Sequence, residues 1–168
     1  MLAYKFLRPG AVGPFSGHAW PQGAWVAAGG GTSLCRRGVH ACRVEDLPRW
    51  IERELWAVEL RGDVVATRWK LVAPAGRLVR RIEAWDDDAA AAFAGACIDR
   101  VRALGLPGYV EDAKAHCTGP RAEEDRALAA AVAGVIAAHA AGEAGGADGV
   151  ARERAAQAAW FRERLGLR

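Results

Sequence analysis

Two thiols and an imidazole lie within eight residues of this chain, in the stretch Cys35-Arg-Arg-Gly-Val-His-Ala-Cys42. The chain has only four cysteines and four histidines, so this is its densest grouping of metal-binding side chains. Zinc prefers four sulfur or nitrogen ligands in a tetrahedral arrangement. Cys35, His40 and Cys42 would provide three of these ligands, and His18 or Cys117 the fourth. One interpretation of the stretch is therefore a zinc site.

Two other interpretations of the same stretch need no metal. On a strand, His40 and Cys42 share a face, where Cys42 would be a small buried side chain and His40 a hydrogen-bonded one. Alternatively, His40 faces a small-molecule or nucleotide pocket beside Tyr4, His18 and Trp20. There an imidazole can donate a hydrogen bond or act as a general base near neutral pH. His40 is accordingly the candidate catalytic residue, and all three interpretations stay open.

The elements that would position these residues lie in residues 1–85, which hold six of the seven tryptophans. A helix is expected to begin at Asp46, as its N-cap, and to run to about Arg53. The glycine- and proline-rich segment 9–31 would form a pocket edge or a lid. Glu59 lies on the opposite side of its strand from the apolar residues, so it points outward or into a pocket and joins the candidate ligand-binding residues. Short strands are expected at 2–7, 38–42, 55–60, 64–72 and 78–82.

Residues 86–168 are predicted to form an alanine-rich helical extension that packs on the first domain, because 26 alanines occur in these 83 residues. A first helix would begin at the acidic run 86–88 and end at Gly105, and a shorter one would follow. The loop 142–149 would separate two more helices. The apolar stripe of the third consists of Leu128, Val132, Val135, Ile136 and His139. The predicted class is α+β, a small twisted antiparallel sheet with one helix followed by alanine-rich helices.

Composition and charge exclude several classes of protein. With 52% hydrophobic and 26% charged residues, the chain can fold around a core. No window close to 18 uncharged apolar residues and no signal peptide are evident, so we expect a cytoplasmic protein with reduced cysteines and no membrane partner. Residues 1–85 have six more basic than acidic residues. We interpret this excess as a solvated surface and do not expect a nucleic acid partner. Its candidates for phosphate contacts are Arg36, Arg37, Arg43, Arg49, Arg68, Lys70, Arg77, Arg80 and Arg81.

Two resemblances add to this interpretation. The opening Tyr4-Lys5-Phe6 and the pattern Cys35-x4-His40-x-Cys42, followed by a helix and a strand, resemble a family of short phage and bacterial proteins with no assigned activity. That likeness covers about residues 2–85. The segment 38–60 also resembles the middle of ADP-ribosyltransferase-like folds.

The second resemblance implies an NAD or nucleotide pocket, with Tyr4 or Lys5 in the position of an NAD-contacting residue. Trp69 and Lys70 stand where that fold normally brings its catalytic glutamate, so the pocket would lack this carboxylate. The expected function is small-molecule or nucleotide binding in a domain of this shape. The alternative is a non-enzymatic interaction module, whose C-terminal helices contact a protein partner or a second copy and whose Cys35, His40 and Cys42 could hold a structural zinc.

Overall fold

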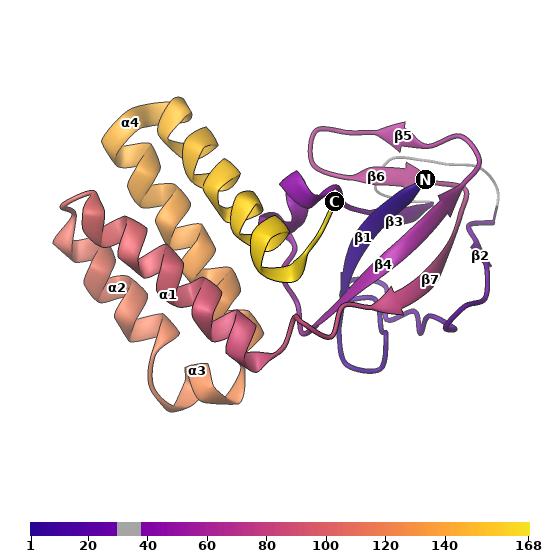
Figure 1. Ribbon diagram of the computed structural model, residues 1–168, viewed down its shortest axis with the longest axis horizontal. Coiled ribbons are helices and arrows are strands. Elements are labelled where there is room, and N and C mark those ends of the chain that lie inside the picture. Colours follow the sequence, from indigo (N-terminus) through magenta and orange to yellow (C-terminus); the bar gives the residue numbers. More distant parts are fainter. Residues whose placement is uncertain (30–37) are drawn as a thin grey trace. The chain divides into compact units, whose positions relative to one another are not determined.

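The computed structural model describes residues 1–29 and 38–168, and its class is α+β, which confirms the prediction (Figure 1). The chain divides into two compact units. One comprises Met1–Leu47 and Glu52–Glu83, and the other Pro48–Ile51 and Ala84–Arg168. We refer to them as the strand unit and the helix unit. Cys35 of the predicted zinc site lies outside the described residues.

The strand unit contains two antiparallel sheets. The larger has the order β1-β4-β7-β2 and the smaller the order β3-β6-β5. Their bounds are β1 Leu2–Leu7, β2 Val26–Ala27, β3 Val39–Ala41, β4 Glu54–Arg61, β5 Val65–Ala66, β6 Leu71–Ala73 and β7 Ala75–Arg81. Both sheets contribute to a core of Ala3, Leu7, Ala11, Trp20, Val39, Ala41, Trp56, Val58, Leu60, Leu71, Ala73 and Leu78.

Alternation along β1 and β4 puts two charged residues on the face that bears this core. Ala3 pairs with Val58 and Lys5 with Trp56 across the two strands. Side chains two residues apart on a strand point the same way. Lys5 therefore shares the face of Ala3, and Glu54 shares the face of Trp56.

A β-bulge interrupts the pairing of β4 with β7. Ala57 pairs with Arg80 and Val58 with Leu78, so Val79 has no partner on β4. An inserted residue of this kind reverses the alternation beyond it. Arg81 consequently pairs with Trp56 and shares its face.

The helix predicted between Asp46 and Arg53 is wrong in type and length. Val44–Arg49 forms a 3₁₀ helix, with Pro48 inside it. Proline has no N–H with which to continue an α-helical ladder, and it disfavours helical geometry in the residue before it. Asp46 is not an α-helical N-cap, because its carboxylate accepts a hydrogen bond from Arg43 Nε at 2.7 Å.

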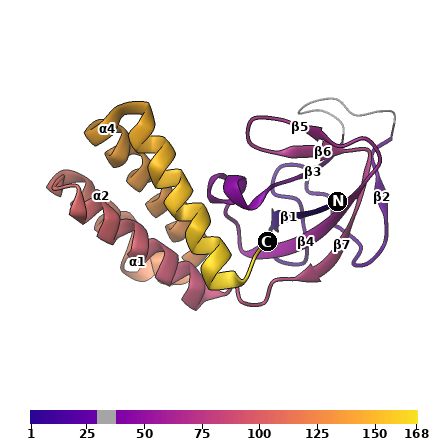
Figure 2. The same ribbon diagram turned by 45° about the horizontal axis from the view of Figure 1, so that its top comes forward.

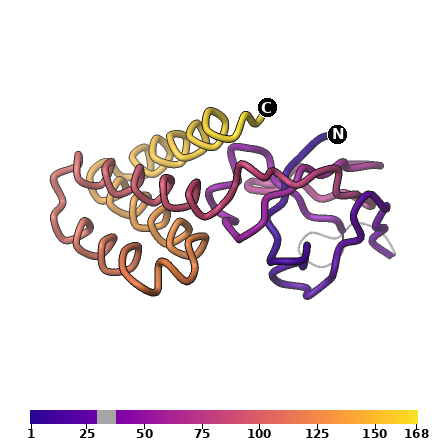
Figure 3. Tube along the Cα trace, turned by 60° about the horizontal axis from the view of Figure 1, so that its bottom comes forward, coloured from indigo at the N-terminus to yellow at the C-terminus, as the bar shows by residue number. Residues whose placement is uncertain are grey.

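The helix unit contains α1 (Asp87–Ala103), α2 (Pro107–Cys117), α3 (Pro120–Glu124) and α4 (Arg126–Leu165). As the sequence predicts, Asp86 caps α1, and its Oδ1 accepts a hydrogen bond from Ala89 N at 2.8 Å. The chain reverses inside α4, where Gly145 and Gly146 have non-helical backbone angles. Figures 2 and 3 show the two arms of α4 running back along each other. This reversal falls within the predicted loop 142–149.

The first arm of α4 buries a different face from the one predicted. Leu128 and Val135 are 60% and 46% exposed. The buried side consists of Ala127, Ala130, Ala133, Gly134, Ala137, Ala138 and Ala141. These small residues leave room for large side chains from other helices, as at Gly134, where a Cβ atom would lie 3.4 Å from the Phe93 ring. Phe93 and Phe161 then fill the core of the bundle, with ring centroids 5.0 Å apart.

The expectation that no apolar window approaches membrane-spanning length is also wrong. An 18-residue window of α4 has a mean hydropathy of 1.5, and half of that window is buried within the protein. A buried core helix of a soluble protein has the same composition, so the window is weak evidence for a membrane span.

Candidate functional site

An open pocket of about 380 Å³ lies on the strand unit. Two buried tryptophans, Trp20 and Trp56, contribute to its lining, and three charged residues, Glu54, Arg80 and Arg81, lie beside them. Gln22 and the backbone of Gly10 and Ala11 form other parts of the wall. The pocket thus combines parts of two tryptophan side chains with a lining that is mainly polar and charged, and such polar groups can fix the orientation of a small molecule.

The carboxylate of Glu54 is the most heavily hydrogen-bonded group of this pocket. Its Oε1 accepts from Gly10 N and its Oε2 from Ala11 N, both at 3.0 Å. Oε2 also accepts from Trp56 Nε1 at 3.0 Å, and Arg81 Nη1 lies 3.5 Å from Oε1. Burial alone would raise the pKa of Glu54. The hydrogen bonds from Trp56, Gly10 and Ala11 and the charge of Arg81 outweigh burial and lower it.

The corner at Gly10 and Ala11 connects Glu54 to Trp20. Ala11 has a φ of +58°, a left-handed conformation that alanine adopts at a cost of about 1–2 kcal/mol. The Ala11 carbonyl accepts a hydrogen bond from Trp20 N at 3.0 Å. Glu54 therefore stabilises the strained backbone at Ala11. The hydrogen bond from Trp20 N to the Ala11 carbonyl then positions Trp20.

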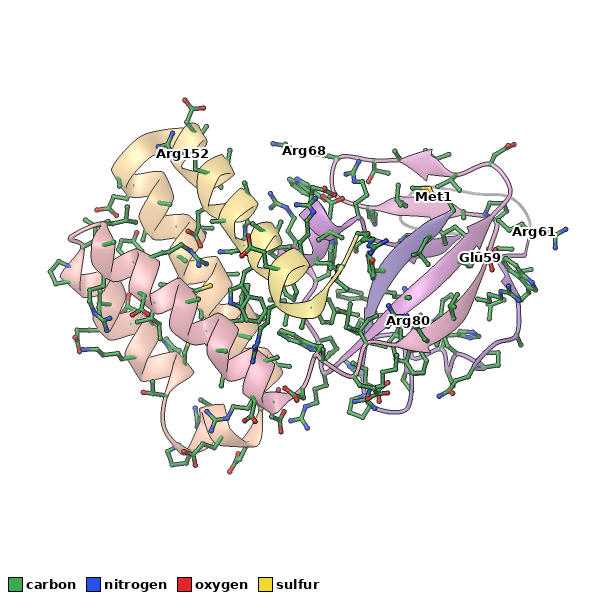
Figure 4. The ribbon with its side chains drawn as sticks, viewed as in Figure 1. Met1, Glu59, Arg61, Arg68, Arg80 and Arg152 are labelled. Atoms are coloured by element: carbon green, nitrogen blue, oxygen red, sulfur yellow. The ribbon has the colours of Figure 1, made fainter. Side chains whose placement is uncertain are left out.

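The two arginines of the pocket differ in their partners. Arg81 is 3.5 Å from both Glu54 and Glu83, and the bulge in β7 turns it toward Glu54. The side chain of Arg80 forms no ion pair or hydrogen bond with any residue of the described ranges. Figure 4 shows Arg80 near the end of β7, away from Glu59 and Arg61 farther along the sheet. Arg80 is the charge in this pocket that is available to a ligand.

Lys5 contacts Trp20 but is not part of the pocket lining. Its Nζ donates to the His40 carbonyl at 2.7 Å and lies 5.3 Å from the centroid of the Trp20 ring. Burial, with a smaller effect of Lys70, lowers the pKa of Lys5 to about 8. His18 meets the same tryptophan edge-on, with ring centroids 5.7 Å apart. Lys5 and His18 therefore both contact Trp20, but of these three predicted ligand-binding residues the pocket lining includes Trp20 and not Lys5 or His18, and their role in binding stays a prediction.

Tyr4 and His40 lie outside the pocket lining. The backbones of Tyr4 and Cys42 exchange hydrogen bonds of 2.9 and 2.6 Å, so these two residues share the strand face opposite Lys5. His40 alternates with Val39 and Ala41, which point into the core, and none of the three predicted residues Tyr4, His18 and His40 lines the pocket. Burial, followed by the charges of Lys70 and Lys5, lowers the pKa of His40.

The surroundings of the predicted metal ligands favour a neutral thiol. Burial raises the pKa of Cys42 to about 12, whereas zinc binds the thiolate. Among the residues that the structure describes, no three His, Cys, Asp or Glu side chains are grouped as metal ligands. His18 contacts Trp20, and Cys117 is buried in α2 of the helix unit. Because Cys35 is outside the described residues, the zinc site stays a prediction.

Glu59 forms an ion pair on the sheet instead of lining the pocket. Its Oε2 accepts from Arg77 Nε at 2.7 Å. Arg77 and Arg61 in turn lie 5.0 and 5.6 Å from the centroid of the Trp25 ring. Trp69 and Lys70, which the sequence resemblance sets in place of a catalytic glutamate, belong to the turn in which Thr67 N donates to Lys70 O at 2.8 Å, and that resemblance stays a prediction.

Sequence reasoning missed Glu54, Trp56 and Gln22 as pocket residues. A signal for Glu54 exists, since it has the same parity on β4 as Trp56 and Leu60 and is thus a charge on an otherwise apolar face. No such signal marks Gln22. Comparison with known proteins adds nothing to this site, because no family model, no curated protein and no solved structure matches the chain.

Proposed function

We propose that the strand unit binds a nucleotide or a similar small molecule with a flat ring and an anionic group. The ring would lie against Trp20 and Trp56, and the anionic group would bind Arg80. One observation carries this proposal, namely a free arginine beside two tryptophans in a pocket of about 380 Å³. That volume falls within the range of ordinary ligand pockets.

The proposal is for binding and assigns no reaction. Histidine and cysteine are the side chains that most readily exchange protons near neutral pH, and neither occurs among the described residues that line the pocket. Glu54 already accepts hydrogen bonds from Gly10, Ala11 and Trp56, so it is poorly suited to act as a base. His40, the predicted catalytic residue, lies outside the lining and receives no catalytic role here.

Isothermal titration with adenosine, AMP, ADP and NAD tests the proposal. We expect AMP and ADP to bind more tightly than adenosine, because only the phosphates reach Arg80. Arg80→Ala should weaken ADP binding by about tenfold or more, in line with the loss of a charged hydrogen bond. Arg61→Ala is the matched control, since Arg61 contacts Trp25 and not the pocket. Absence of binding by all four compounds would refute the proposal.

A second candidate function, an interaction module, is favoured by the exposed stripe on α4. Leu128 and Val135 are exposed, and no charged residue occurs from Ala127 to Gly142. Exposed apolar surfaces of this kind often mark interaction sites. Native mass spectrometry would reveal a second copy, and Val135→Lys should abolish that dimer.

The same spectrum would reveal a bound zinc, whose loss in Cys42→Ser would support the predicted metal site.

A further inference from the structure

Three segments of the strand unit converge on one carboxylate in the wall of the pocket. Glu54 is buried on β4, and its partners come from the corner before Val12, from β4 itself and from β7. The Gly10 and Ala11 amides and the Trp56 indole donate hydrogen bonds to it, and the Arg81 guanidinium forms an ion pair with it. All four residues also line the pocket.

This set of partners occupies most of the carboxylate. A carboxylate has about four acceptor positions. Three of those of Glu54 accept hydrogen bonds, Oε1 from Gly10 N and Oε2 from Ala11 N and Trp56 Nε1, and Arg81 Nη1 forms an ion pair with Oε1 at 3.5 Å. A buried polar network that is satisfied in this way rigidifies the structure around it.

We infer that Glu54 is the positioning residue of the pocket, which holds both tryptophans in the orientation that the ring of the ligand meets. Trp56 is held directly through its indole N–H. Trp20 is held through the Ala11 corner, whose carbonyl accepts the Trp20 amide. This inference rests on the proposed function, because it concerns how the same pocket binds a ring.

The chemistry of the position requires an anion. A glutamine has the same shape, but its amide has two N–H donors on one side. In either orientation of the amide, its N–H groups would face N–H donors of the protein. These donors are Gly10 N on one side of the side chain, or Ala11 N and Trp56 Nε1 on the other. The left-handed conformation of Ala11 would lose the bond that compensates its strain.

The test compares Glu54→Gln with Glu59→Gln, a matched control on the same strand whose carboxylate bonds Arg77 outside the pocket. Titrations with adenosine and ADP distinguish binding of the ring, which both compounds have, from binding of the phosphates, which only ADP has. Glu54→Gln should weaken both compounds by about tenfold, because both have the ring. Arg80→Ala should weaken ADP alone. Glu59→Gln should bind both as the natural chain does. Unchanged binding by a folded Glu54→Gln variant would overturn the inference.

A measurement without ligand distinguishes failure of the inference from failure of the proposed function. In ¹H–¹⁵N spectra of the natural chain, we expect the Gly10 and Ala11 amides and the Trp56 indole to shift together as Glu54 is protonated. The other charged groups around this carboxylate are Arg80, Arg81 and Glu83. A shared transition below pH 4.5 supports the inference even if no nucleotide binds. Independent transitions of the three signals contradict it, and this measurement needs no variant that folds.

Discussion

The ammonium group of Lys5 lies 5.3 Å from the ring centroid of Trp20, on the core-bearing face of the strand unit. Its hydrogen bond goes to a carbonyl, that of His40, at 2.7 Å. Within the described residues no carboxylate is bonded to this amine. The positive charge of Lys5 therefore interacts with two neutral groups, the His40 carbonyl and the Trp20 ring.

Lys5→Met should alter how stability depends on pH. Burial lowers the pKa of Lys5 in the folded state to about 8, against 10.5 when unfolded. Below pH 8 the lysine is charged in both states, and the folded state carries the full cost of burying that charge. Between pH 8 and 10.5 the unfolded chain binds more protons, so the stability of the natural chain rises with pH.

Urea unfolding at pH 7 to 10 checks this expectation. Lys5→Met should be more stable than the natural chain at pH 7, by about 2 kcal/mol after loss of the bond to the His40 carbonyl, and the rise above pH 8 should disappear. Lys114→Met is the control, since Lys114 is exposed and pairs with Glu111. An identical pH profile for Lys5→Met and the natural chain would contradict the prediction.

Glu54→Gln should destabilise the strand unit at neutral pH. Hydrogen bonds lower the pKa of Glu54 below its usual 4.5. The stability that its charged form contributes is therefore present above about pH 4.5 and is lost as the pH falls through the folded pKa. We expect a loss of about 2–3 kcal/mol at pH 7, because buried N–H donors are left unpaired. Chemical denaturation at pH 7 and pH 3 should show this difference shrinking in acid.

Gly149→Ala should destabilise the helix unit by about 3 kcal/mol. A Cβ atom at Gly149 would overlap the Ala141 carbonyl, where the two arms of α4 meet. Gly95→Ala in α1 is the control, since its Cβ atom would have no neighbour within 4 Å, and it should stabilise the protein by about 0.5–1 kcal/mol. Thermal unfolding of both variants measures the contrast, and equal melting temperatures would refute it.

Glu153→Ala should cost about 3–5 kcal/mol of unfolding free energy, because it leaves a partly buried Arg100 without its partner. Arg100 Nε lies 2.9 Å from Glu153 Oε2, and Gln157 Nε2 donates to Glu153 Oε1 at 2.7 Å. Glu111→Ala, which breaks an exposed pair with Lys114, should cost about 0.5 kcal/mol or less. A double-mutant cycle of Arg100 and Glu153 would give their coupling energy, and a value near zero would contradict the prediction.

Local chemistry in the sequence was enough to predict the class of the fold and several of its boundaries. Asp86 caps α1 because a short carboxylate reaches the free amides of the first turn. The glycines of 142–149 predict the reversal within α4, since their backbone adopts angles that interrupt a helix. Alternation of apolar residues likewise predicts β4, and the short apolar run Leu2–Leu7 predicts β1.

Tertiary structure decided what these elements bury and which residues line the pocket. The first arm of α4 turns its alanines inward because large side chains such as Phe93 need the space, and no period in the sequence states which partners will be present. The pocket depends on contacts between residues far apart in the chain, such as Gly10 with Glu54 and Glu54 with Arg81. Sequence patterns describe the faces of single elements, whereas hydrogen bonds between elements exist only after those elements have packed.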